Sequence, residues 1–190
     1  MRTYLLAACW WVAGGSWAVA ETTEHWVGSA EITFSGTSTL HSWKGMVAAN
    51  PFDAAVTRDA SGNLLHLKAK VDIEAQQMDT AEAKRDENMH RVMKVNDYPL
   101  VSGTIDAPAA QIIGEGGNPL ALPLKLKLLG KEQGLTGVIS KWSLSGKEAS
   151  FELDFQVSLK TSGIEVPATA FFIRVGDAIK VHARVKLRLS

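Results

Sequence analysis

The sequence predicts an all-β protein: a closed antiparallel barrel of about eight strands, with one helical insert capping an end. Most of the chain alternates apolar and polar residues with a period of two, the spacing of strands with one buried face. Turn-forming stretches such as DASGN (59–63) and GEGGNP (114–119) separate these segments at short intervals, without helical crossovers. Long strands in a meander favour a closed barrel, which leaves no exposed edge.

The strands are expected in chain order as follows. Alternation over residues 26–34 predicts the first strand, and short segments near Phe52 and Val101 are two more. Further strands are predicted over residues 65–73, 120–128, 135–144, 151–159 and 179–189, with GKEQG (130–134) and SGKE (145–148) as turns. The last strand sets an apolar face against a basic face, Lys180 to Arg188, which is expected to be solvated and would also suit transient contact with an anionic membrane surface.

The first 20 residues have the pattern of a secretory signal peptide. Arg2 precedes a short apolar run, and Ala18-Val19-Ala20 forms a small-residue cleavage site. We therefore expect a mature domain over residues 21–190, located in the periplasm or secreted. An alternative is lipoprotein processing before Cys9, but that would leave an apolar tail on the mature chain.

Composition excludes several classes of function. Removal of Arg2 with the signal leaves 19 basic residues against 20 acidic ones, which argues against a nucleic-acid partner. Cys9 is the single cysteine, so the mature chain has neither disulfides nor thiol chemistry. The five histidines show no metal-ligand spacing, and no nucleophile elbow or phosphate loop is present. We predict no metal, no cofactor and no enzymatic activity, although catalytic groups brought together only in space stay an alternative.

Alternation alone does not say which face of a barrel points inward, because an outer-membrane barrel alternates too. Tyr98 is the single tyrosine after the signal, so aromatic girdles are hard to build, and the chain ends without a terminal aromatic residue. A barrel with an apolar interior is therefore favoured.

Residues 80–93 interrupt the strand pattern and predict an amphipathic helix. Asp79 and Glu82 have the spacing of a capping box, and Pro99 ends the segment. Met89, Val92 and Met93 form one apolar stripe, which we expect to roof the open end of the barrel. Arg85 is a candidate contact for a polar headgroup, whereas Asp86 is expected in solvent because adjacent helical residues diverge.

Two motifs carry a resemblance to a known family. RDENMHRVMKVNDYP (85–99) and FSGTSTLHSWKGMV (34–47) are similar to segments of the YceI-like family of exported lipid-binding proteins, and the C-terminal strand pattern also fits. The resemblance implies a lipocalin-like barrel that holds an isoprenoid-type lipid, a polyprenyl chain or a quinone. Val92 and Met93 replace the usual aromatic pair, and LVSGTI (100–105) replaces a more usual Ile-x-Phe.

The predicted ligand site is an apolar tunnel under the helix. Its candidate residues are Phe34, Trp43, Phe52, Arg85, Met89, Val92, Met93, Leu124 and Leu126. Small inward residues such as Gly28 and Gly45 are expected to leave volume for the ligand, unless bulky neighbours fill it. The alternative function is therefore a filled barrel, a structural or partner-binding module without ligand. The oligomeric state stays open.

Overall fold

The computed structural model describes residues 20–39, 41–165 and 175–190. The elements in chain order are β1 (Thr22–Thr37), β2 (Ser42–Ala48), β3 (Phe52–Arg58), β4 (Leu64–Glu74), η1 (Ala75–Gln77), α1 (Ala83–Val92), β5 (Leu100–Pro108), η2 (Ala109–Gln111), β6 (Ala121–Leu128), β7 (Lys131–Ser145), β8 (Glu148–Ser158) and β9 (Ala178–Leu189). The predicted signal peptide lies, apart from Ala20, outside the described residues.

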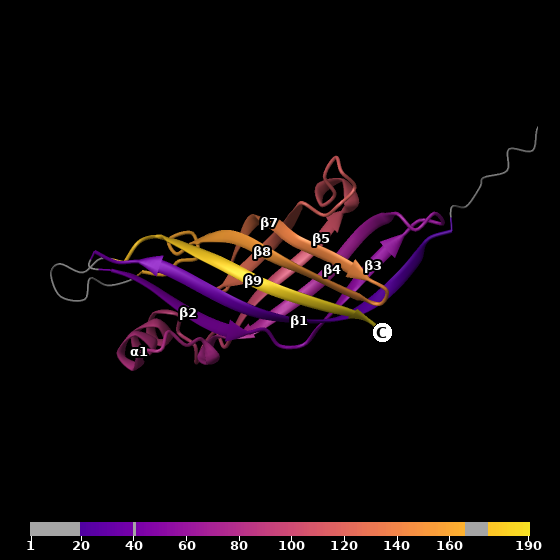
Figure 1. The fold of residues 1–190 in the computed structure, drawn as a ribbon. Helices are drawn as coiled ribbons and strands as arrows, with labels where there is room; N and C mark the ends of the chain where they lie inside the picture. The colour runs from indigo at the N-terminus through magenta and orange to yellow at the C-terminus, as the bar shows by residue number, and fades with distance from the viewer. Residues whose placement is uncertain (1–19, 40, 166–174) are drawn as a thin grey trace, which may run out of the picture.

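The strands form a closed antiparallel barrel (Figure 1). Neighbours pair in chain order from β3 to β9, and β9 pairs with β1 to close the ring. The other edge of β1 pairs with β3 along its first half and with β2 along its second half. β2 and β3 therefore act as one wall strand interrupted at residues 49–51, where Pro51 has no amide N–H to donate. The predicted barrel of about eight strands is confirmed.

The apolar face of each strand points into the barrel. On β6, Leu122, Leu124, Leu126 and Leu128 are buried, whereas the lysines between them are exposed. Leu120, predicted to start this row, is 59% exposed. Its amide N–H donates to the carbonyl of Ile112, so it belongs to the preceding connection rather than to the strand.

The β6–β7 hairpin differs from the prediction. GKEQG (130–134) is not a turn: β7 begins at Lys131, which pairs with Leu128. The loop is therefore Leu129 and Gly130 alone, with φ angles of 52° and 73°. Two positive φ values are typical of a type I′ turn, which normally uses Asn and Gly. Leu129 gave no sequence signal for such a turn.

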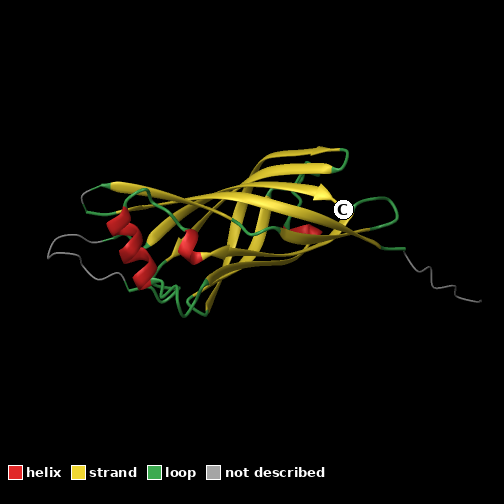
Figure 2. Ribbon diagram, turned by 90° about the horizontal axis from the view of Figure 1, so that it is seen from below, coloured by secondary structure: helices red, strands yellow, loops and turns green. Residues whose placement is uncertain are grey.

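The helix is shorter than predicted. Asp79 does not cap it; its carboxylate accepts from the amide of Ala81 at 2.7 Å, and Ala81 has a φ of 57°, outside helical geometry. α1 starts at Ala83, with the Glu82 carboxylate accepting from the amides of Lys84 and Arg85. Its predicted place is confirmed, since α1 lies at one end of the barrel and the C-terminus at the other (Figure 2).

Candidate ligand-binding cavities

Within the part of the chain that the structure describes, the barrel interior holds two cavities. The helix-end cavity, about 510 Å³, lies under α1, and the far cavity, about 810 Å³, lies in the opposite half. Five residues line both and form a waist between them: Ile32, Ile73, Leu126, Phe155 and Ala183. The alternative without ligand requires a barrel interior filled by side chains, and the two cavities show that the interior is not filled.

The roof of the helix-end cavity consists of the predicted apolar stripe. Met89 and Val92 are half-buried and Met93 is buried, and all three line the cavity. Phe34 and Trp43 line it from the opposite wall, with ring centroids 6.3 Å apart at 75°, an edge-to-face contact. These five predicted residues thus lie around one cavity.

The remaining apolar candidates belong partly to the other cavity. Phe52 and Leu124 line the far cavity, whereas Leu126 lines both. The reason is the interrupted wall strand: Phe52 opens β3, which pairs with the first half of β1, while Phe34 lies on the second half. What the sequence predicted as one tunnel is two cavities that meet at a waist.

Three inward glycines hold aromatic rings instead of leaving space for a ligand. Each lies opposite an aromatic residue on the paired strand: Gly28 and Phe52, Gly36 and Trp43, Gly45 and Phe34. A Cβ added to any of the three would collide with that ring. The expectation that Gly28 and Gly45 leave volume is therefore wrong, since such pairs place the ring over the glycine. The cavities are instead bordered by the small side chains of Ala30, Ala69 and Ala183.

A polar network fixes the start of α1. Thr80, 5% exposed, donates from its amide and its hydroxyl to Asp86 Oδ1 at 2.9 and 2.6 Å, and its hydroxyl accepts from Arg85 Nε at 2.9 Å. Burial works to raise the pKa of Asp86, but the two hydrogen bonds from Thr80, together with smaller effects of Asp79 and His90, hold this pKa below its usual value. The expectation that Asp86 lies in solvent is wrong: the tight turn at Ala81 brings Thr80 within reach of both adjacent side chains.

The rim of the helix-end cavity is cationic. Lys84, Arg85 and Arg91 line it together with one acidic residue, Glu82. The Glu82 carboxylate already accepts from two backbone amides at the helix start, and Arg85 is oriented by Thr80. Such a rim suits a ligand group with acceptor oxygens, because guanidinium and ammonium groups only donate hydrogen bonds.

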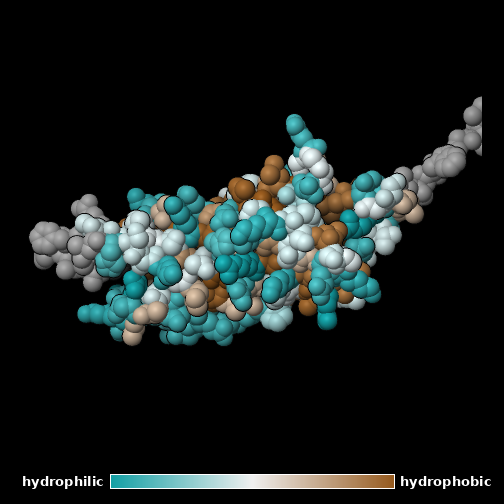
Figure 3. Space-filling model, viewed as in Figure 1, coloured by the Kyte–Doolittle hydropathy of each residue, from teal (hydrophilic) through white to brown (hydrophobic). Residues whose placement is uncertain are grey.

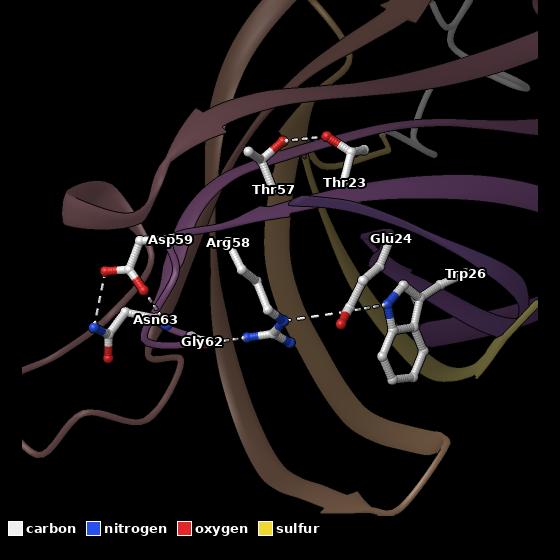
Figure 4. A network of polar contacts seen from close by, with 8 residues as sticks. All are labelled: Thr23, Glu24, Trp26, Thr57, Arg58, Asp59, Gly62 and Asn63. Carbon is white, nitrogen blue, oxygen red and sulfur yellow. Dashed lines mark hydrogen bonds and ion pairs between the residues drawn. The ribbon is translucent and has the colours of Figure 1, made fainter. Parts of the chain in front are cut away.

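The far cavity has a different polar boundary, shown in Figure 4. Glu24 Oε2 accepts from Trp26 Nε1 and from Arg58 Nε, both at 3.1 Å, and Arg58 Nη1 donates to the carbonyl of Gly62 at 3.1 Å. Asp59 closes the adjoining turn, and its pKa lies below the usual value because Asn63 and neighbouring amides donate to it. No sequence motif signalled the pair of Glu24 and Arg58, since the two residues are 34 positions apart.

No group of three or more His, Cys, Asp or Glu side chains in the described ranges could hold a metal ion. Among these same residues, no helix is long and apolar enough to cross a membrane. His90, one of the five histidines, has Nε2 3.1 Å from the carbonyl oxygen of Met78 and so ties α1 to the preceding segment.

Fold and cavities define a lipocalin-like barrel with a hollow apolar interior. No protein-family model and no curated protein matches the sequence. Among solved structures, Burkholderia cenocepacia BcnA matches with a TM-score of 0.64 and 16% identity, over 83% of this chain and 95% of BcnA. A polyisoprenoid-binding domain from Saccharophagus degradans, implicated in plant cell wall breakdown, matches with a TM-score of 0.62 and 11% identity, over 86% and 98%.

A mutant YceI protein of Campylobacter jejuni also matches, with 17% identity over 74% of this chain and 83% of that one, at a TM-score of 0.46. The matching structures thus include a polyisoprenoid-binding domain and a YceI protein. At these identities the likeness shows the fold, and it is the fold that the resemblance predicted.

Proposed function

We propose that this protein is an exported carrier that holds an isoprenoid-type lipid, a polyprenyl chain or a quinone, inside its barrel. The observation that carries the proposal is the apolar helix-end cavity, roofed by Met89, Val92 and Met93. Its volume falls in the range of about 300–1,000 Å³ typical of ligand pockets. The fold shared with a polyisoprenoid-binding domain supports the same ligand class.

The apolar residues of the roof and wall would contact the hydrocarbon chain of the lipid, and Arg85 its polar headgroup. The methionines of the roof adapt to an irregular chain, because an unbranched thioether has three rotatable bonds. Apolar contact with the wall supplies roughly 25 cal/mol per Å² removed from water, so a few isoprene units suffice for tight retention. Arg85 would meet the polar headgroup, since it lines the cationic rim and is oriented by Thr80.

The test is an organic extract of the purified protein analysed by mass spectrometry. We expect one apolar molecule per chain, with the fragmentation of repeated isoprene units. An extract without a stoichiometric apolar molecule would leave the protein as a partner-binding module and overturn the proposal.

Export is the part of the proposal that rests on the sequence alone. We propose cleavage after Ala20, which would make Glu21 the first mature residue. N-terminal sequencing of the protein from a periplasmic fraction checks this, and an acylated Cys9 would contradict it.

A further inference from the structure

The far cavity is the larger of the two and differs in its wall. Five aromatic residues line it: Trp26, Phe52, Trp142, Phe151 and, at the waist, Phe155. The ring centroids of Trp142 and Phe151 lie 6.1 Å apart. Its volume of about 810 Å³ is by itself in the range of a ligand pocket. Aromatic faces and edges favour contact with other π-systems over contact with saturated chains.

This cavity reaches the surface without passing α1. β5 and β6 pair only over three residues each, Ser102–Thr104 with Lys125–Lys127, so their other ends separate. The 109–120 connection fills the space between them, with Ile112 buried against the barrel. Exposed residues line the cavity from three separate connections or strand ends: Asn63, Ala110, Asn118 and Leu144.

The surface on this side includes exposed apolar side chains. Leu120, Val138 and Leu144 are 59%, 58% and 51% exposed. Figure 3 shows exposed hydrophobic residues among the hydrophilic ones in the region of β7. The mouth of the far cavity thus opens beside apolar surface, whereas the helix-end cavity opens among cations.

The far cavity carries no net charge. Arg58 is the one charged side chain among its described lining residues, and Glu24 neutralises it at 3.1 Å. An anionic group placed there would gain little from an arginine already paired, and would lose its hydration beside five aromatic rings. A neutral apolar group pays no such penalty.

We propose that the far cavity is a second ligand compartment with a mouth of its own, which takes a neutral apolar group bearing an aromatic ring or double bonds. Such a group is either the far end of the lipid held under α1, in which case the inference rests on the proposed function, or a separate molecule, in which case it does not. The chemistry of the compartment is the same for both sources.

The test uses 1-bromonaphthalene, whose bromine quenches tryptophan fluorescence at short range, and its 4-sulfonate as the matched anion, on protein stripped of bound lipid. Trp26 and Trp142 line the far cavity and Trp43 the helix-end cavity, so quenching that Trp43→Phe removes belongs to the helix-end cavity, and quenching that Trp142→Phe removes belongs to the far cavity. We expect the neutral probe to quench Trp142 at least fivefold more tightly than the sulfonate.

Ala69→Leu narrows the far cavity and leaves the helix-end cavity unchanged, because Ala69 lines the first and not the second. We expect it to weaken quenching of Trp142 at least fivefold while the far-UV spectrum and melting temperature stay those of a folded barrel. Absence of quenching at Trp142, equal quenching by the sulfonate, or no effect of Ala69→Leu would each overturn the proposal.

Mass spectrometry of extracts then separates the two sources. If Ala69→Leu and Met89→Lys both lose the same molecule, the group is the far end of one lipid. If Ala69→Leu loses a molecule that Met89→Lys retains, it is a separate ligand. If no lipid co-purifies with wild type, the proposed function fails, while the quenching experiment still decides whether the compartment binds.

Discussion

Replacement of Met89 by lysine tests whether α1 roofs a bound lipid. Met89 is half-buried and lines the helix-end cavity, and lysine has nearly the same length. The new ammonium group would lie beside hydrocarbon without an acceptor, which costs roughly 1–3 kcal/mol for a polar group left unpaired in a protein. Retention of lipid should therefore weaken about 5- to 150-fold. The assay is the amount of lipid extracted per mole of purified protein.

Two variants make this experiment specific. Met89→Leu conserves volume and should keep its lipid, since such swaps usually cost less than about 1.5 kcal/mol. Ala83→Lys places the same added charge on an exposed position of α1 and should also keep it. All three should retain the far-UV spectrum of a β fold. If Met89→Lys carries as much lipid as wild type, α1 is only a plug, and the reasoning from its apolar stripe is refuted.

The barrel could be predicted because burial imposes a period of two on every strand. The leucines of β6 and the apolar row of β9 alternate so regularly that the residues sharing one face of each strand follow from the sequence. The turn at Leu129 and Gly130 could not be predicted, because a leucine with positive φ is imposed by the pairing of β6 with β7 rather than by its own preference. The helix start at Ala83 was missed for a similar reason: Ala81 adopts a positive φ that its side chain disfavours.

The candidate residues were predictable as inward-facing positions, but their division between two cavities was not. That division depends on where β1 exchanges β3 for β2 as its partner, which no local pattern records. The glycines show the same limit: Gly28 is small in the sequence, yet the ring of Phe52 covers it. The space that a small residue leaves in the interior depends on the side chain of its cross-strand partner, and the pairing of strands is known only from the closed barrel.

Two further variants test the network and packing around α1. Because the pKa of Asp86 is lower in the folded protein than its ordinary value of 3.8, its carboxylate stabilises the fold above pH 3.8, and this contribution is lost as the pH falls through the lowered pKa. The Asp86→Asn variant should therefore melt at a lower temperature than wild type at pH 6, and its melting temperature should fall less between pH 5 and pH 2.5. Parallel curves of melting temperature against pH for the two proteins would contradict this. Gly45→Ala tests the ring-over-glycine pairs, because its Cβ would collide with the ring of Phe34 and lie 2.7 Å from the carbonyl oxygen of Asp79, a backbone atom that holds the segment before α1 against β2. Overpacking of this kind costs about 1–3 kcal/mol, and each kcal/mol lowers the melting temperature by roughly 2–4 °C in a domain of this size. Gly134→Ala is the matched control, since nothing lies within 4 Å of its added Cβ. Calorimetry should show a loss for Gly45→Ala alone, and equal melting temperatures for the two variants would mean that Phe34 moves aside freely and does not shape the helix-end cavity.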